Sequence, residues 1–127
     1  MRTRRISLAI ALSMTAVGLM ASCKKESQQS FVTQLSGTWV SNSSSYEEIA
    51  NERTTLDAGR YTIVFNEDST YTMTDNGVTC SSGRYDKEGD VLTLSNTNYE
   101  IETLSSSKLV VENRKSSILR HYDFDKK

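Results

Sequence analysis

The single histidine of this 127-residue chain is the residue best suited to bind a metal or transfer a proton. His121 is followed two positions later by Asp123, so in a strand both side chains lie on one face. Two ligands fall short of the three or four that a zinc site needs, so we expect a structural histidine and no metal. Glu47 and Glu48 form an acid pair without a recognisable acid–base partner. We therefore predict that the protein is not an enzyme, has no catalytic residues and binds no cofactor.

The N-terminus combines a basic start with a short apolar run that ends at a cysteine. Met1–Arg5 carries three arginines, Ile6–Met20 is almost wholly apolar, and Ala21-Ser22-Cys23 follows. This order of basic, apolar and small residues is typical of a secretory signal peptide. The apolar run is shorter than the roughly 20 residues that span a membrane. We predict a signal peptide over residues 1–22, with an ordinary secretory signal or a transmembrane helix as the alternatives.

The residues around the predicted cleavage point resemble a bacterial lipobox, because small Ala21 and Ser22 stand directly before Cys23. The resemblance implies that Cys23 becomes the lipidated first residue of the mature protein and anchors it in the bacterial cell envelope. No Asp follows Cys23, which by the same resemblance favours the outer membrane, on its periplasmic or surface face. Cys80 is then an unpaired thiol, expected to behave as a small buried hydrophobe. Without lipidation, a Cys23–Cys80 disulfide becomes the alternative.

The mature chain has the size of one domain with one modest core. Loss of Arg2, Arg4 and Arg5 with the signal peptide leaves 12 basic and 16 acidic residues, a net charge of −4. Because there is no basic patch, nucleic acid is not an expected partner. Residues 23–34, the lipidated cysteine and a polar stretch rich in Ser and Gln, are predicted to form a tether.

From residue 35 onward, short segments of alternating polar and apolar residues are separated by turn-forming residues. In Asn98–Thr103, Tyr99 and Ile101 alternate with two glutamates, which predicts a strand with one face in water and one in a core. Similar segments are expected around residue 39 and at 61–65, 70–74, 78–86, 90–95, 108–112 and 118–124. About eight strands at regular spacing predict an all-β sandwich or barrel. Residues 42–59 are predicted to be a long loop with at most one helical turn.

Gly37-Thr38-Trp39 resembles the G-x-W signature that opens the first strand of lipocalins and their relatives. Three later segments are similar to small bacterial lipocalin-like domains in the same order: Asp68–Tyr71, Ser82–Tyr85 and Gly89–Leu94. The resemblance covers residues 35–124. It implies an all-β fold, an antiparallel up-and-down barrel of about eight strands over residues 35–127. The T-D-Y motif of lipocalins is missing, which leaves a distant calycin as the alternative.

The same resemblance assigns structural roles at the closed end of the barrel. Gly37 lets the entering chain kink closely, and Trp39 plugs the barrel with a large apolar ring. In this family an arginine of the last strand commonly packs across the tryptophan, a cation–π contact of roughly 0.5–2 kcal/mol. Arg120 is the expected residue, because it shares a face of its strand with apolar neighbours, and Arg114 is the alternative.

The inward-facing residues are the predicted ligand site. An eight-stranded barrel is filled by its own side chains or holds one small ligand. By analogy with the family, we predict that a small apolar or amphipathic molecule binds against Tyr71, Met73 and Tyr99, beside Ile63 and Phe65. The membrane and this ligand are the expected partners.

Two other functions remain open at this point. Ser82-Gly83-Arg84-Tyr85 faintly resembles the Ser-Gly-x-x-Tyr loops of periplasmic lysozyme inhibitors, which implies a module that binds another envelope protein. A barrel filled by its own side chains would instead be a structural lipoprotein.

Overall fold

The computed structural model describes residues 28–127, so the predicted signal peptide, Cys23 and residues 24–27 lie outside the described residues. Within this part, one helix, α3 (Gln28–Leu35), precedes the strands. The strands are β2 (Gly37–Ser41), β3 (Tyr46–Ile49), β4 (Glu52–Thr55), β5 (Tyr61–Phe65), β6 (Thr70–Asp75), β7 (Val78–Glu88), β8 (Val91–Leu94), β9 (Thr97–Leu104), β10 (Lys108–Lys115) and β11 (Ile118–Lys126). The predicted all-β class is confirmed.

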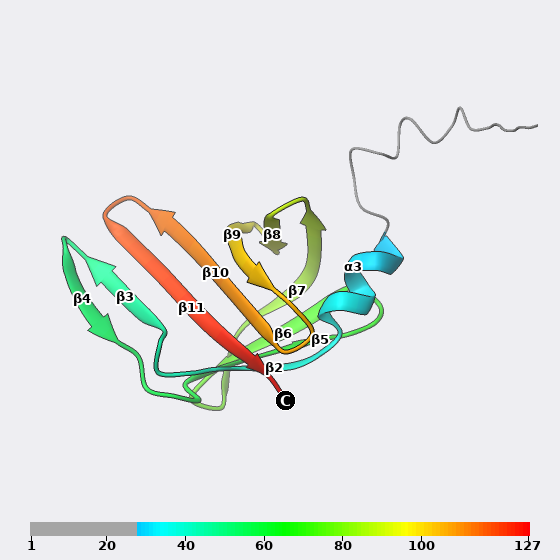
Figure 1. Ribbon diagram of the computed structural model, residues 1–127, viewed down its shortest axis with the longest axis horizontal. Helices are drawn as coiled ribbons and strands as arrows, with labels where there is room; N and C mark the ends of the chain where they lie inside the picture. The colour runs from blue at the N-terminus through cyan, green and yellow to red at the C-terminus, as the bar shows by residue number, and fades with distance from the viewer. Residues whose placement is uncertain (1–27) are drawn as a thin grey trace, which may run out of the picture.

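Eight of these strands close into an antiparallel barrel (Figure 1). Their order around the barrel is β2-β5-β6-β7-β8-β9-β10-β11, and β11 pairs back with β2 through Phe124 and Ser41. Strands β5 to β11 follow one another in the barrel as they do in the sequence, and the β3–β4 hairpin lies between β2 and β5 along the chain. The predicted eight-stranded up-and-down barrel is therefore confirmed.

The barrel interior is filled by the apolar residues of the alternating segments. On β5, Tyr61, Ile63 and Phe65 are buried while the residues between them are partly exposed. Side chains from all eight barrel strands meet in one core, and burying each large side chain contributes roughly 1.5–3 kcal/mol. The buried set comprises Phe31, Leu35, Trp39, Leu56, Tyr61, Ile63, Phe65, Tyr71, Met73, Tyr85, Leu92, Leu94, Leu109, Val111, Tyr122 and Phe124.

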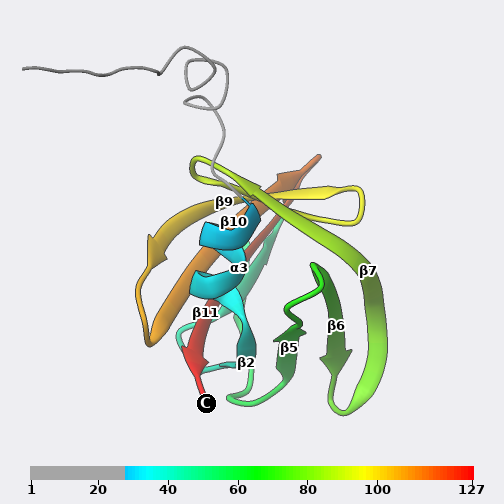
Figure 2. The same ribbon diagram turned by 90° about the vertical axis from the view of Figure 1, so that its right-hand side faces the viewer.

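The predicted tether was wrong for its second half, because Gln28–Leu35 forms α3 and covers one end of the barrel. Figure 2 looks at the molecule with this helix nearest the viewer. Phe31 and Leu35, one turn apart, are both buried, and the Phe31 ring packs edge-on against Tyr85 at 5.8 Å between centroids. Phe31, Val32 and Leu35 are the three apolar residues of this eight-residue segment, too few to predict a helix. Across residues 28–127, no helix has the length and apolar character that crossing a membrane requires.

The predicted loop over residues 42–59 was also wrong in part, since β3 and β4 form a hairpin within it. Ala50 and Asn51 take positive φ values of 50° and 69° in the turn. β3 pairs with the first half of β11, where Tyr46 lies opposite His121. All four residues of β4 are exposed. Because no residue of β4 is buried, its sequence lacks the alternation of apolar and polar residues by which a strand is predicted.

Two turns show how local sequence fixes the strand register. Asn76 and Gly77 have φ values of 51° and 85° and join β6 to β7, as an Asn-Gly pair does in a tight hairpin. Ser69 is buried with a φ of 70°, a conformation that favours glycine.

Candidate functional site

Trp39 is fully buried beside α3, at the end of the barrel that the helix covers. Its indole Nε1 donates a hydrogen bond of 2.8 Å to the carbonyl oxygen of Leu35. The Lys126 ammonium lies 5.3 Å from the Trp39 ring centroid, within the range of a cation–π contact. Gly37 has a φ of +128°, and a Cβ there would lie 2.8 Å from Cε of Lys126. The glycine of the G-x-W motif thus leaves room for the lysine beside the tryptophan.

The prediction that Arg120 packs across Trp39 was wrong. Lys126 is the residue of β11 that pairs with Trp39, and Arg120 lies six positions earlier, about 20 Å along the strand. Arg120 instead pairs with Glu47 of β3, with 3.4 Å between Nε and Oε2. Without the register of β11, the sequence could not show which cation of the last strand reaches the tryptophan.

Three tyrosines, here named the tyrosine cluster, gather toward the other end of the barrel: Tyr61, Tyr99 and Tyr122. The ring of Tyr122 lies 5.0 Å from that of Tyr61 and 6.2 Å from that of Tyr99, measured between centroids. Tyr61 is the first residue of β5, whereas Phe65, the last, pairs with Gly37 next to α3. The two ends of the barrel interior therefore differ in composition.

The tyrosine cluster consists of neutral phenols at physiological pH. Burial raises the pKa of Tyr122, and the neighbouring Tyr61 and Tyr99 raise it further. Burial also raises the pKa of Tyr99, where Arg120 acts in the opposite direction, and the pKa of Tyr61. Three phenols that donate and accept hydrogen bonds, with the Arg120–Glu47 pair close by, give this end polar atoms within apolar walls.

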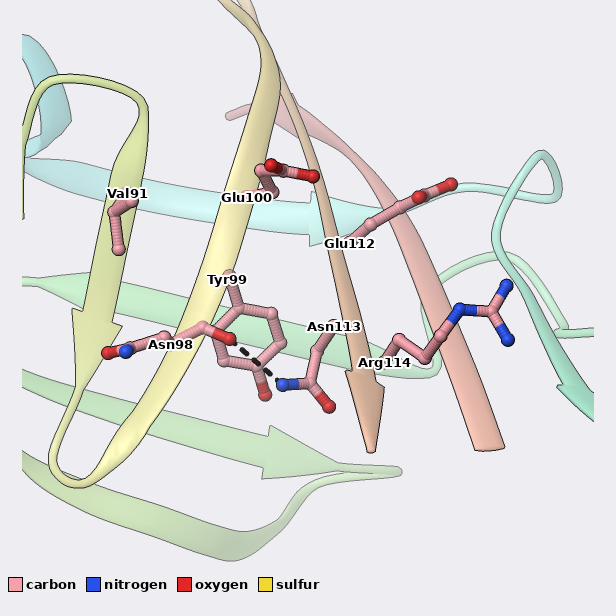
Figure 3. Close-up of a pocket in the computed structure, with 7 residues that line it drawn as sticks. All are labelled: Val91, Asn98, Tyr99, Glu100, Glu112, Asn113 and Arg114. Atoms are coloured by element: carbon pink, nitrogen blue, oxygen red, sulfur yellow. Dashed lines mark hydrogen bonds between the residues drawn. The ribbon is translucent and has the colours of Figure 1, made fainter. Parts of the chain in front are cut away.

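A depression of about 250 Å³ opens in the barrel wall between β9 and β10 (Figure 3). The backbone pairing of these strands ends at Glu100 and Glu112. Beyond this point the Asn113 side-chain nitrogen donates a hydrogen bond of 2.9 Å to the carbonyl oxygen of Asn98. A side chain thus replaces backbone pairing where the strands separate. The lining residues are Val91, Asn98, Tyr99, Glu100, Glu112, Asn113 and Arg114. Tyr99 therefore connects the depression to the tyrosine cluster.

Four of the five predicted ligand-binding residues lie deep in the barrel core: Ile63, Phe65, Tyr71 and Met73. The Tyr71 hydroxyl is held by two serine hydroxyls, that of Ser81 at 2.6 Å and that of Ser95 at 2.9 Å. Tyr99 is half-buried and lines the wall depression. The structure brings the other four together as packed core residues, and their contact with a ligand stays a prediction.

The segment compared with lysozyme-inhibitor loops lies inside strand β7. Ser82 pairs with Thr72, and Tyr85 is buried, with its ring 4.7 Å from that of Phe65. Its hydroxyl donates to the Asn66 carbonyl oxygen at 3.0 Å. The segment is therefore part of a paired strand, in which Tyr85 belongs to the core while Ser82, Gly83 and Arg84 are exposed, and binding of another protein by it stays a prediction.

The predicted pair of His121 and Asp123 does not act as one unit. Asp123 accepts hydrogen bonds from Lys108 Nζ at 2.9 Å and Asn42 Nδ2 at 3.0 Å. His121 Nδ1 lies 2.9 Å from Oε2 of Glu112, and the nearby Glu102 is the third member of a group that could hold a metal ion. Loss of solvent and the adjacent Glu112 raise the pKa of Glu102.

Sequence reasoning missed this group because its members come from three strands, which only the register brings together. It also misplaced Cys80, which is an exposed free thiol on β7. Burial, although partial, still raises the pKa of this thiol, which lowers its thiolate fraction.

The eight strands form a closed antiparallel barrel with a buried tryptophan at one end and tyrosines toward the other. Barrels of this size have a narrow interior that is filled by their own side chains or holds one small ligand. The family model described as a lipocalin-like domain matches residues 35–111, from the end of α3 into β10. The chain belongs to this lipocalin-like family. Neither the curated proteins nor the solved structures contain a significant match.

Proposed function

We propose that this lipocalin-like barrel binds a small amphipathic molecule at the wall depression between β9 and β10. The observation that carries this proposal is the position of Tyr99, which packs against Tyr122 of the tyrosine cluster and also lines the depression. Val91, an exposed apolar residue, stands on another side of it. Apolar surface with a few polar groups is the usual composition of small-molecule sites.

The polar groups of the depression determine which part of a ligand lies where. The Tyr99 ring and Val91 offer apolar contact, while Asn113, Glu112 and Arg114, which also line the depression, carry polar groups. A molecule with an apolar ring or chain and one polar group matches this division. Binding is reversible and involves no covalent step.

The test uses anilinonaphthalene sulfonate, an amphipathic anion whose fluorescence rises when water is excluded. We expect saturable binding by the Cys23→Ala chain and a loss of about tenfold or more in affinity in Tyr99→Ala, since the ring supplies most of the apolar contact. Arg114→Gln should weaken binding severalfold if the anion contacts the guanidinium. Lys115→Gln is the matched control, because this exposed cation is adjacent in sequence but does not line the depression.

Unchanged affinity in Tyr99→Ala would move the site elsewhere and contradict the proposal. Native mass spectrometry of the protein purified from a bacterial host gives a second measurement. A reproducible extra mass that leaves on denaturation would support a natural ligand and give its size. A clean mass together with no probe binding would favour the filled, structural barrel.

We further propose that Cys23 anchors the protein in the bacterial cell envelope, most simply the outer membrane. The support is the sequence pattern around Cys23. In Cys23→Ala, the protein should move from the membrane fraction to the soluble fraction on cell lysis. Cys80→Ser is the control that should stay in the membrane fraction, and membrane retention of Cys23→Ala would contradict the anchor.

A further inference from the structure

The outer wall of the barrel brings one imidazole and two carboxylates together from three neighbouring strands. His121 on β11 lies directly opposite Glu112 on β10. A bulge in β9 leaves Glu102 as an extra residue, because Val110 pairs with Thr103 and Val111 pairs with Ile101. Bulges commonly redirect a side chain, and here the extra residue reaches the other two. One candidate ligand atom from each of the three residues lies within 4.8 Å of the others.

These separations suit a metal ion after a small side-chain adjustment. Nitrogen and oxygen ligands at about 2.0–2.2 Å from a tetrahedral zinc ion are about 3.4 Å apart. The Nδ1–Oε2 separation of His121 and Glu112 is 2.9 Å, slightly below this value. Glu102 is exposed, and its candidate ligand atom lies within 4.8 Å of those of the other two residues.

The imidazole is already held in place before any ion arrives. Its ring stacks on Tyr46 of β3 with centroids 4.6 Å apart and planes 13° from parallel. The guanidinium of Arg53 covers the Tyr46 ring at 3.8 Å. The histidine side chain is 14% exposed, so its motion is restricted. A ligand that is fixed by its neighbours loses less entropy when it coordinates a metal.

The charge around the three residues favours a cation. Glu100, opposite Glu112 on β9, adds a third carboxylate to this surface. Among residues 28–127, no lysine or arginine forms an ion pair with Glu100, Glu102 or Glu112. Arg53 of β4 and Arg120 of β11 are paired with Glu48 and Glu47, and Arg114 is the cation of β10 that stands two residues from Glu112.

We propose that Glu102, Glu112 and His121 form a binding site for a divalent transition metal ion of the zinc type. Imidazole nitrogen together with carboxylate oxygen suits Zn²⁺ or its neighbours, whereas Mg²⁺ and Ca²⁺ prefer oxygen ligands alone. Three protein ligands on an open surface leave at least one coordination position for water or for a group of another molecule.

The test titrates zinc chloride into the full chain without an affinity tag, with Cys23 and Cys80 replaced by serine so that thiols do not compete. Calorimetry should show one zinc ion bound per chain at micromolar concentrations. His121→Gln, Glu112→Gln and Glu102→Gln should each weaken binding at least tenfold. Glu100→Gln is the matched control, a carboxylate on the same surface outside the three, and should change affinity less than threefold.

Because His121 is the single histidine, the ¹⁵N resonances of its ring report coordination directly. Zinc should shift them in the parent chain and in Glu100→Gln. Magnesium chloride at the same concentration should leave them unchanged. Absence of zinc binding, binding that survives all three substitutions, or binding that leaves the imidazole resonances unmoved would each overturn the site.

Discussion

The two ends of the barrel interior use aromatic residues for different purposes. Beside α3, Trp39 is fully buried, its nitrogen is bonded to Leu35, and Lys126 occupies the space that Gly37 leaves open. At the other end, Tyr99 is half-buried and lines a depression where β9 and β10 separate. The first end is sealed by contacts within the chain, whereas the second has a half-buried tyrosine at a depression in the barrel wall.

This difference indicates where the chain can change without unfolding. A sealed end derives its stability from close packing, so loss of one large side chain leaves a cavity. An end that faces a depression has fewer contacts to lose, and its side chains are available for another molecule. Substitutions at each end separately test this contrast between the sealed end and the end at the depression.

The largest effect is expected from Trp39→Ala. Removing a fully buried aromatic side chain costs about 3–5 kcal/mol in the free energy of unfolding. Tyr99→Ala, at the half-buried position, should cost clearly less. Urea denaturation followed by circular dichroism measures both, with the slope checked for equality. Equal losses would show that the two ends are packed alike.

A smaller effect is expected from Gly37→Ala, of about 1–3 kcal/mol, because the left-handed φ of +128° is strained for any residue with a Cβ. The new Cβ would also press on Lys126. Combining the change with Lys126→Ala should therefore recover part of the loss, and a double-mutant cycle of unfolding free energies measures the coupling. Strictly additive losses would mean that backbone strain alone explains the glycine.

The smallest effect appears only at high pH and concerns the tyrosine cluster. Burial raises the pKa of Tyr61, Tyr99 and Tyr122 above their ordinary value of 10.0. The stability that these phenols contribute is complete below pH 10 and is lost as the pH rises toward their folded-state pKa values. Ultraviolet absorbance should show that these three phenols ionise above pH 10 in the folded protein. Unfolding curves from Tyr122→Phe should depend less on pH above pH 10. Ionisation of these three phenols with a midpoint at or below pH 10 in the folded protein would contradict this.

The sequence predicted the barrel because its strands are amphipathic, with one face in the core. The alternation at 61–65 and the G-x-W motif both correspond to observed strands, and the family match agrees with them. It failed where that pattern is weak. α3 buries two residues within a polar segment, and all of β4 is exposed, so neither shows the pattern.

The site depends on information that a single strand does not contain. Whether Arg120 or Lys126 reaches Trp39 follows from the offset between β2 and β11, and the meeting of Glu102 with His121 requires a bulge. Hydrophobic periodicity defines faces, but it does not define these offsets. Tyr99 was predicted because it is a large amphipathic residue on the inward face of its strand, yet its place at a gap between strands depends on where pairing stops.

The β3–β4 hairpin leaves an open strand edge, which matters when the protein is present at high concentration. Barrel closure pairs every strand on both sides except β4, which has β3 on one side and, within residues 28–127, no strand on the other. An open edge of this kind can recruit a strand from another chain and start aggregation. Here the edge is only four residues long and carries Glu52 and Arg53, so it is a poor template. Among residues 28–127, this short charged edge therefore offers another chain little backbone with which to pair.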